Sequence, residues 1–414
     1  MKQHIKIEDL KKNTRFSQDV FFEDGHCLLL SAGNPLGDRE LRALRQWKIP
    51  FVVTEGTILK DGEEIDLEAL ESFDEEIPDK SEASNTIYIE GSQLSNANIE
   101  IVSKMVVFEL PKELKDSSLY SEYKDILKEL HEVFDAIKEN KKLNEKHLSP
   151  YALRIKKMAS EHPQETIIFV LARNEEENDI VFEALNTALV IALVCPLMNI
   201  DAEVTLDIIV AGLLHNVGML RLPTPLTNKT DKLTEAEIQI LKTHILHAYK
   251  CTVEELSYPE SVGNSILQQY ERWDGKGYPE GLSGTNINLG ARLISVVDAF
   301  VTTLGKKTQR KPILSYEAIK TLLSDSSLKF DPNIVKIVVQ CMGIYPIGSV
   351  VLLNNGAICK VIKVVSDAPL RPCVQVILSE TGKIPSEKDK QFIDLKEMKD
   401  KFIVRAVDPR VYLQ

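Results

Sequence analysis

The chain has 414 residues, of which 43% are hydrophobic and 27% charged, values typical of a water-soluble globular protein with more than one domain. Its formal net charge of −12 excludes a general affinity for nucleic acid or anionic membrane, because such binding needs a basic surface. Six scattered cysteines without a Cys-x-x-Cys pair exclude a cysteine-based zinc cluster and favour a reducing, cytoplasmic location. No apolar leader is visible, and the most apolar run, residues 188–198, is too short to span a bilayer, so no membrane span is expected.

Residues 1–58 predict a small β-rich module with one helix. Short apolar runs on both sides of Asp24-Gly25 indicate a hairpin, and residues 38–54 predict a helix followed by a strand. Residues 59–115 form an acidic linker and a segment without a clear pattern. The acidic stretch, residues 61–82, favours a solvated linker over a docking tail.

Residues 116–344 predict a helical domain. Six apolar residues recur at the i, i+3, i+4, i+7 spacing of an amphipathic helix: Ile126, Leu127, Leu130, Val133, Phe134 and Ile137. Thr234 and Glu237 form the capping box of a later helix. Residues 345–414 change to an alternating pattern with a hairpin turn at Asn355-Gly356, which predicts a small all-β domain. The expected fold class is therefore mainly α, a helical bundle flanked by two small β-rich domains.

Three polar residues on different predicted helices are candidates for metal binding. Asp298 stands within an apolar helix and needs a partner, because an unpaired buried carboxylate is costly. Together with His215 and His244 it forms a plausible metal constellation in a helical bundle. The alternative is that His215 is a packed, hydrogen-bonded core side chain and that His244 is a surface residue.

The order of several motifs resembles the HD-GYP family, bacterial phosphodiesterases that linearise the second messenger cyclic di-GMP. The resemblance covers roughly residues 179–341 and rests on "LLHNVG", "ERWDGKGYPEGLSG", "ARLISVVDAF" and "FDP". It implies a helical HD-type phosphohydrolase fold, a role in signal transduction, and cyclic di-GMP as the ligand. It also implies that the loop with Gly277, Tyr278 and Pro279 shapes the nucleotide pocket and offers a docking surface for diguanylate cyclase domains. The two ends of the chain resemble small modules that accompany such domains.

The chain departs from the family where the family binds two metal ions. Its name-giving His-Asp pair is His215-Asn216 here, and a neutral amide is a far poorer bridging ligand than a carboxylate. The family's phosphate-binding lysine is Met219, and its two adjacent histidines correspond to Gln269 and Tyr270. Neither Gln nor Tyr is a good ligand for iron, manganese or zinc. One metal position therefore keeps His244 alone.

The other metal position retains more of its residues. By resemblance it keeps Glu183, His215 and Asp298, with Asp179 one turn before Glu183 as an additional carboxylate. This set allows one iron, manganese or zinc ion, or none. A solvated acidic helix face accounts equally well for Asp179 and Glu183.

Anion-binding positions of the family correspond to Lys307 and Arg310, which an ordinary exposed helix end explains equally well. We expect a degenerate HD-GYP protein that binds cyclic di-GMP or a protein partner with little or no hydrolysis. The alternatives are an active phosphodiesterase with an altered metal centre and a purely structural interaction module. Two-metal hydrolysis needs both ions to activate water and stabilise charge, which makes turnover by this chain doubtful.

Overall fold

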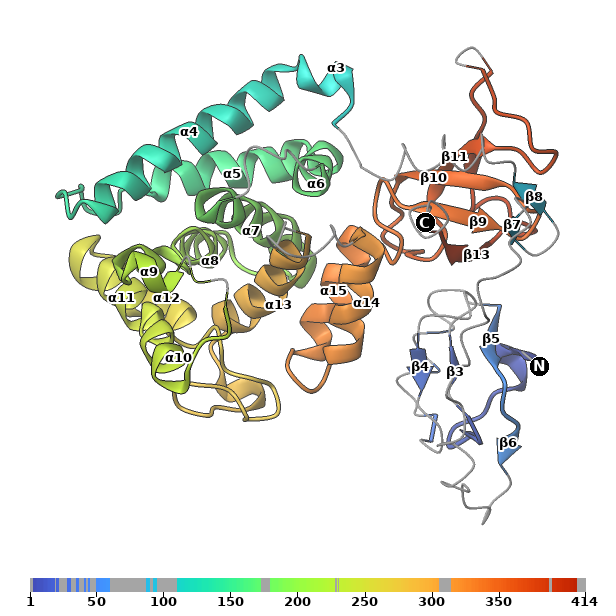
Figure 1. Cartoon of the computed structure of the whole chain (residues 1–414), viewed down its shortest axis with the longest axis horizontal. Helices are drawn as coiled ribbons and strands as arrows, with labels where there is room; N and C mark the ends of the chain where they lie inside the picture. The colour runs from blue at the N-terminus through green and yellow to red at the C-terminus, as the bar shows by residue number, and fades with distance from the viewer. Residues whose placement is uncertain are drawn as a thin grey trace. The chain divides into compact units, whose positions relative to one another are not determined.

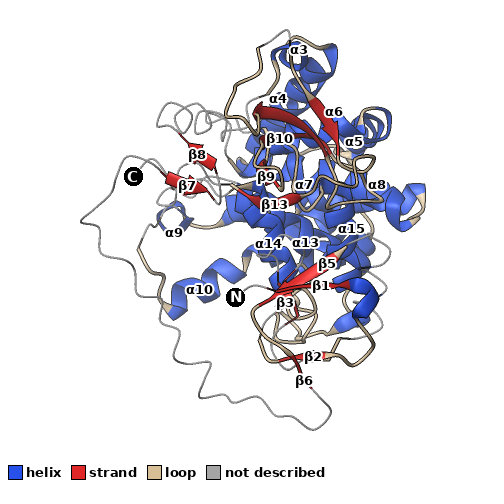
Figure 2. Cartoon of the chain, turned by 90° about the vertical axis from the view of Figure 1, so that its right-hand side faces the viewer, coloured by secondary structure: helices blue, strands red, loops and turns tan. Residues whose placement is uncertain are grey.

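The computed structural model describes most of residues 3–59 and 110–407, together with 87–89 and 92–94. Its gaps are residues 19, 22–27, 31–34, 37–40, 42–43, 45–49, 173–178, 228, 230, 305–313 and 387–388. The chain divides into two compact units, one comprising Phe108–Cys341 and the other Met1–Val107 with Met342–Gln414. The first is helical and the second contains the sheets, which confirms the predicted fold class (Figures 1 and 2).

The helical unit is a bundle with one central helix (Figure 1). Its helices are α3 (Lys112–Lys115), α4 (Ser118–Lys138), α5 (Ser149–Glu161), α6 (Pro163–Leu171), α7 (Ile180–Val194), α8 (Ala202–Leu214), α9 (Thr224–Thr227), α10 (Glu235–Lys242), α11 (His244–Lys250), α12 (Glu260–Leu267), α13 (Leu289–Leu304), α14 (Ser315–Asp325) and α15 (Pro332–Met342). Helix α7 packs against α4, α5, α6, α8 and α13, and its side chains are buried without interruption from Ala184 to Val194. An apolar sequence with no polar face therefore forms the centre of the core.

Two sequence predictions about helices are confirmed. Helix α4 buries the six predicted apolar residues, and its charged residues are exposed or partly exposed. Helix α10 begins at the capping box, in which the Thr234 side chain accepts from the Glu237 amide and the Glu237 carboxylate accepts from the Thr234 amide.

Two apolar stretches of the core have the length of membrane spans. Ile180–Met198 and Ala202–Arg221 qualify by length and composition, but 72% and 61% of their most apolar windows are buried inside the protein. The first is longer than the sequence pattern indicated, because Cys195–Met198 continues α7 as a 3-10 turn. Both stretches include the mutually packed core helices α7 and α8.

The second unit contains short antiparallel sheets. One has the order β1-β5-β3-β4 and another the order β12-β11-β10-β9-β13, with two-stranded pairs β2-β6 and β7-β8. The strands are β1 (Gln3–Lys6), β2 (Arg15–Phe16), β3 (Val20–Phe21), β4 (Leu28–Leu30), β5 (Phe51–Thr54), β6 (Ile58–Leu59), β7 (Ile87–Ile89), β8 (Ser92–Leu94), β9 (Val350–Leu353), β10 (Ile358–Lys363), β11 (Cys373–Leu378), β12 (Phe392–Asp394) and β13 (Ile403–Ala406).

Several predictions fall in this unit. Strands β9 and β10 pair across Asn355-Gly356, where Gly356 has a φ of 84°, so the predicted hairpin is confirmed. Strands β3 and β4 pair on either side of Asp24-Gly25, which itself lies outside the described residues. Strand β5 confirms the strand expected at the end of residues 38–54. The helix expected before it lies largely outside the described residues, and the acidic stretch, residues 61–82, lies wholly outside them.

Candidate functional site

His215 and Asp298 form the centre of the site, and the Asp298 side chain is 17% exposed. His215 ends α8 and is fully buried, and its Nδ1 donates to the Gly212 carbonyl at 2.7 Å. Its Nε2 lies 3.1 Å from Oδ1 of Asp298, which projects from α13. Both ring nitrogens therefore face acceptors, an arrangement that only the doubly protonated imidazolium satisfies beside a carboxylate.

The electrostatic surroundings agree with this protonation state. Burial alone would lower the pKa of His215, but the charge and hydrogen bond of Asp298, the Gly212 carbonyl and the charge of Glu183 together raise it. The partner that the helix-interior carboxylate was expected to need is thus His215.

His244, the first residue of α11, lies nearby and is neutral in character. It is 4% exposed, and its Nδ1 donates to the Leu241 carbonyl at 2.7 Å. Its Nε2 is buried with no hydrogen-bond partner among the residues that the structure describes. Burial lowers the pKa of His244, and the charge of His215 lowers it further. Gly218 allows this approach, because a Cβ there would lie 1.9 Å from the His244 carbonyl oxygen.

Gln269 and Tyr270 make contacts of a different kind from metal ligation. Gln269 is 3% exposed, and its Nε2 donates to the His215 carbonyl at 2.8 Å, which satisfies an acceptor at the end of α8. The Tyr270 ring meets His244 edge-on at 5.4 Å between centroids and stacks parallel to Tyr278 at 5.2 Å. Burial, together with Asp298, Tyr278 and Glu183, raises the pKa of Tyr270, so its phenol is neutral.

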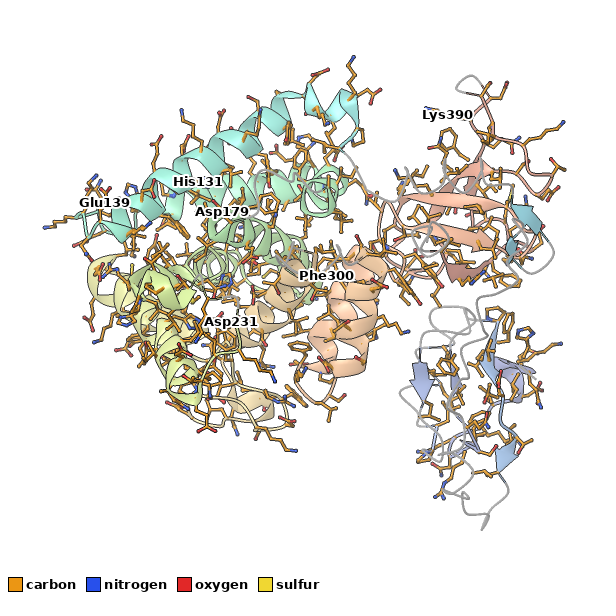
Figure 3. All side chains as sticks on the ribbon, in the orientation of Figure 1. His131, Glu139, Asp179, Asp231, Phe300 and Lys390 are labelled. Atoms are coloured by element: carbon orange, nitrogen blue, oxygen red, sulfur yellow. The ribbon has the colours of Figure 1, made fainter. Side chains whose placement is uncertain are left out.

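The two candidate carboxylates of the α7 region have different surroundings. Glu183 acts electrostatically on both His215 and Tyr270, which indicates that it belongs to the same group. Asp179 instead caps α7, where its Oδ1 accepts from the backbone amides of the next turn at 2.9 and 3.0 Å. Its Oδ2 pairs with Nε2 of His131 on α4 at 2.7 Å (Figure 3).

A buried carboxylate holds the glycine-rich loop, which we define as residues 275–284. Glu271 is 2% exposed, and its Oε1 accepts from the amides of Glu280 and Gly281 at 2.7 and 3.1 Å. Gly277 must lack a side chain, because a Cβ there would lie 2.3 Å from the Arg272 amide nitrogen. The loop is therefore closely attached to the chain that precedes it.

Further contacts fix both sides of the loop. Trp273 and Asp274 donate through their amides to the carbonyls of the α14–α15 connection at 3.0 and 2.9 Å. Lys242 places its Nζ 4.5 Å from the centre of the Tyr278 ring, a cation–π contact. Pro279 and Glu280 are exposed at the tip.

Comparison with known proteins identifies the domains. Residues 169–334 match the family model described as HD domain, and residues 350–414 match the model described as KOW domain associated with HD domain. A cyclic di-GMP phosphodiesterase of Borreliella burgdorferi is 24% identical over 327 residues, which cover 74% of this chain and 86% of that protein. A cyclic di-GMP phosphodiesterase of Pseudomonas aeruginosa is 30% identical over 249 residues, which cover 60% of this chain and 59% of that protein. The helical domain belongs to the HD-GYP family.

Among solved structures, an HDG"Y"P protein from Bdellovibrio bacteriovorus matches with a TM-score of 0.45 and 14% identity, over 82% of this chain and 98% of that one. The HD domain match over residues 169–334 contains "ERWDGKGYPEGLSG" and its neighbouring motifs, and the resemblance to the HD-GYP family is confirmed.

Several of the candidate metal ligands contact protein groups in the structure. Within the described ranges, no group of three or more His, Cys, Asp or Glu residues is arranged to hold a metal ion. His215 uses one ring nitrogen on a carbonyl and the other on Asp298, while Gln269 is bound to backbone. A partial site of Glu183, His215, His244 and Asp298 stays a prediction, as does the metal it would select.

Several site residues lie beyond the sequence predictions or outside the structure. The sequence analysis did not anticipate His131, Lys242 or Glu271. For Glu271 the sequence offered one signal, namely an acidic residue shortly before a glycine-rich loop. Lys307 and Arg310 lie outside the described residues, so their role in phosphate binding stays a prediction.

Proposed function

We propose that this chain is a degenerate HD-GYP signalling protein of the bacterial cytoplasm that binds cyclic di-GMP with little or no hydrolysis. The observation that carries the proposal is the closed pairing of His215 with Asp298, with Gln269 and Tyr270 packed beside it. In this arrangement Asp298 pairs with a side chain of the protein at 3.1 Å.

The loss of hydrolysis follows from what two-metal chemistry requires. Two ions about 3.5–4 Å apart generate hydroxide and stabilise the attacking and leaving oxygens. Asn216 lacks the bridging charge, and Gln269 and Tyr270 have replaced nitrogen ligands with an amide and a buried phenol. Removing a single preorganised stabilising group already costs roughly 100- to 1000-fold in rate, so several losses together reduce turnover to a very low level.

The retained features favour binding. The glycine-rich loop is held by a hydrogen bond to Glu271 and by the stack of Tyr278 on Tyr270, both of which are contacts between protein groups. Two curated relatives carry the name cyclic di-GMP phosphodiesterase, which makes this nucleotide the first ligand to test. Lys307 and Arg310 supply the positive charge for its phosphates in this proposal.

Calorimetric titration of the purified chain with cyclic di-GMP tests the proposal, with the cell contents analysed afterwards for linear dinucleotide. Binding at micromolar or lower concentration with intact nucleotide supports it. The double variant Lys307→Glu with Arg310→Glu should abolish binding, whereas Lys383→Glu with Lys399→Glu, the same charge change on the exposed C-terminal domain, should not.

A second function, hydrolysis at an altered metal centre, is favoured by the proximity of Glu183 and Asp298 to His215. Linear product that appears with added manganese and vanishes in His215→Ala would establish it. A third outcome, no heat and no product, would leave a protein-docking module. Docking of diguanylate cyclase domains on Gly277, Tyr278 and Pro279 is part of that alternative.

A further inference from the structure

Tyr270 contacts the glycine-rich loop in two ways. Its ring stacks on the Tyr278 ring at 5.2 Å with an interplanar angle of 4°, and its carbonyl accepts from the Tyr278 amide at 3.2 Å. The same ring also packs edge-on with His244 on α11. One side chain therefore joins the loop to the helix that carries a candidate ligand.

The position of Tyr270 relative to the carboxylates is also informative. Asp298 and Glu183 both act electrostatically on its phenol, which places the ring close to the two acidic groups of the site. A neutral ring beside two carboxylates and a histidine takes up volume next to groups that would attract a cation.

We propose that Tyr270 is a positioning residue whose ring holds the glycine-rich loop against the helical domain, in place of organisation by bound metal. The proposal rests on the proposed function in one respect, namely that the metal centre has been lost. The column formed by His244, Tyr270 and Tyr278 continues to the ammonium group of Lys242. In this proposal the aromatic ring of Tyr270 holds the loop, and the Tyr270 hydroxyl is not needed for it.

Trypsin cleavage at Lys276 provides a direct readout, because this exposed lysine lies within the loop. Cleavage of a folded protein requires local opening, and its rate follows the open population. Tyr270→Ala should raise the cleavage rate at Lys276 on the order of two- to tenfold or more, the range expected for losing an aromatic pair. Tyr270→Phe, which keeps the ring, should cleave like the wild type.

A matched control separates loop release from general destabilisation. Tyr258 is 4% exposed in the same helical unit, and its hydroxyl accepts from the Leu148 amide. Tyr258→Ala should lower the melting temperature without selective cleavage at Lys276. Should Tyr270→Ala fail to fold, Tyr278→Ala, which removes the other ring of the stack from the partly exposed loop, serves as the second variant.

The outcomes decide the proposal without a nucleotide. Unchanged cleavage in both Tyr270→Ala and Tyr278→Ala, or faster cleavage in Tyr270→Phe equal to that in Tyr270→Ala, would overturn it. Selective cleavage in the alanine variants with a silent phenylalanine variant supports it. Failure of the wild type to bind cyclic di-GMP would instead refute the proposed function and leave this test intact. Where the wild type binds, Tyr270→Ala should weaken affinity and Tyr270→Phe should retain it.

Discussion

Replacing Gln269 with leucine removes one buried hydrogen-bond donor while keeping a side chain of similar size. The lost contact is the 2.8 Å bond from Nε2 to the carbonyl of His215, at the end of α8 where the helix supplies no donor of its own. Gln269 is 3% exposed, so water does not readily replace the bond. Leaving a buried acceptor unsatisfied costs about 1–3 kcal/mol. We therefore expect Gln269→Leu to lower the free energy of unfolding by about 1–3 kcal/mol.

Thermal and urea unfolding measure this cost. For a domain of this size, 1 kcal/mol corresponds to a shift of about 2–4 °C in melting temperature, so we expect a decrease of about 2–12 °C. Gln239→Leu, the same change at an exposed position of α10, should alter stability by less than about 0.5 kcal/mol. If the two variants are equally stable, Gln269 is not a structural replacement for a metal ligand, and the reasoning about this position is wrong.

Three further changes test other parts of the site. Asp298→Asn should lower the free energy of unfolding by about 3 kcal/mol at pH 6 in urea titrations. This loss of stability should shrink at alkaline pH. The pair's stabilisation is complete below the unfolded histidine pKa of about 6.5, and it disappears as pH rises through the raised pKa of folded His215. A loss of stability that does not depend on pH would contradict the ion pair. Glu271→Ala should speed hydrogen exchange at the Gly281 amide at least tenfold, since about 1.5–3 kcal/mol is lost with a charged acceptor; unchanged protection would show that the loop is held otherwise. Gly218→Ala places a Cβ 1.9 Å from a backbone oxygen of α11 and should cost several kcal/mol in thermal unfolding; wild-type stability would refute the close approach.

The spacing of apolar and polar residues along the sequence was sufficient to predict the fold class. The apolar spacing of α4 and the uninterrupted apolar run of α7 reflect how much of each helix surface is buried, and this is local information. Turn residues likewise predicted the hairpin at Asn355-Gly356. Such signals depend on neighbouring residues, which is why the sequence alone carries them.

The site was predictable only in part. Asp298 was expected to need a partner, and His215, 83 residues earlier in the chain, is that partner. What Gln269 does could not be foreseen, because its acceptor is a backbone carbonyl that only tertiary packing brings within reach. Asp179 shows the opposite case, since an aspartate directly before an apolar helix is an N-cap signal that the family resemblance had obscured.

The most direct test of the account is the calorimetric titration of the wild-type protein with cyclic di-GMP, in the presence of manganese, with analysis of the nucleotide recovered from the cell. We predict saturable binding and recovery of the intact cyclic dinucleotide, as expected for a receptor built on an HD-GYP domain without a two-metal centre. Recovery of linear dinucleotide, abolished in His215→Ala, would contradict the account and show that the paired histidine and aspartate exchange their proton for a catalytic metal.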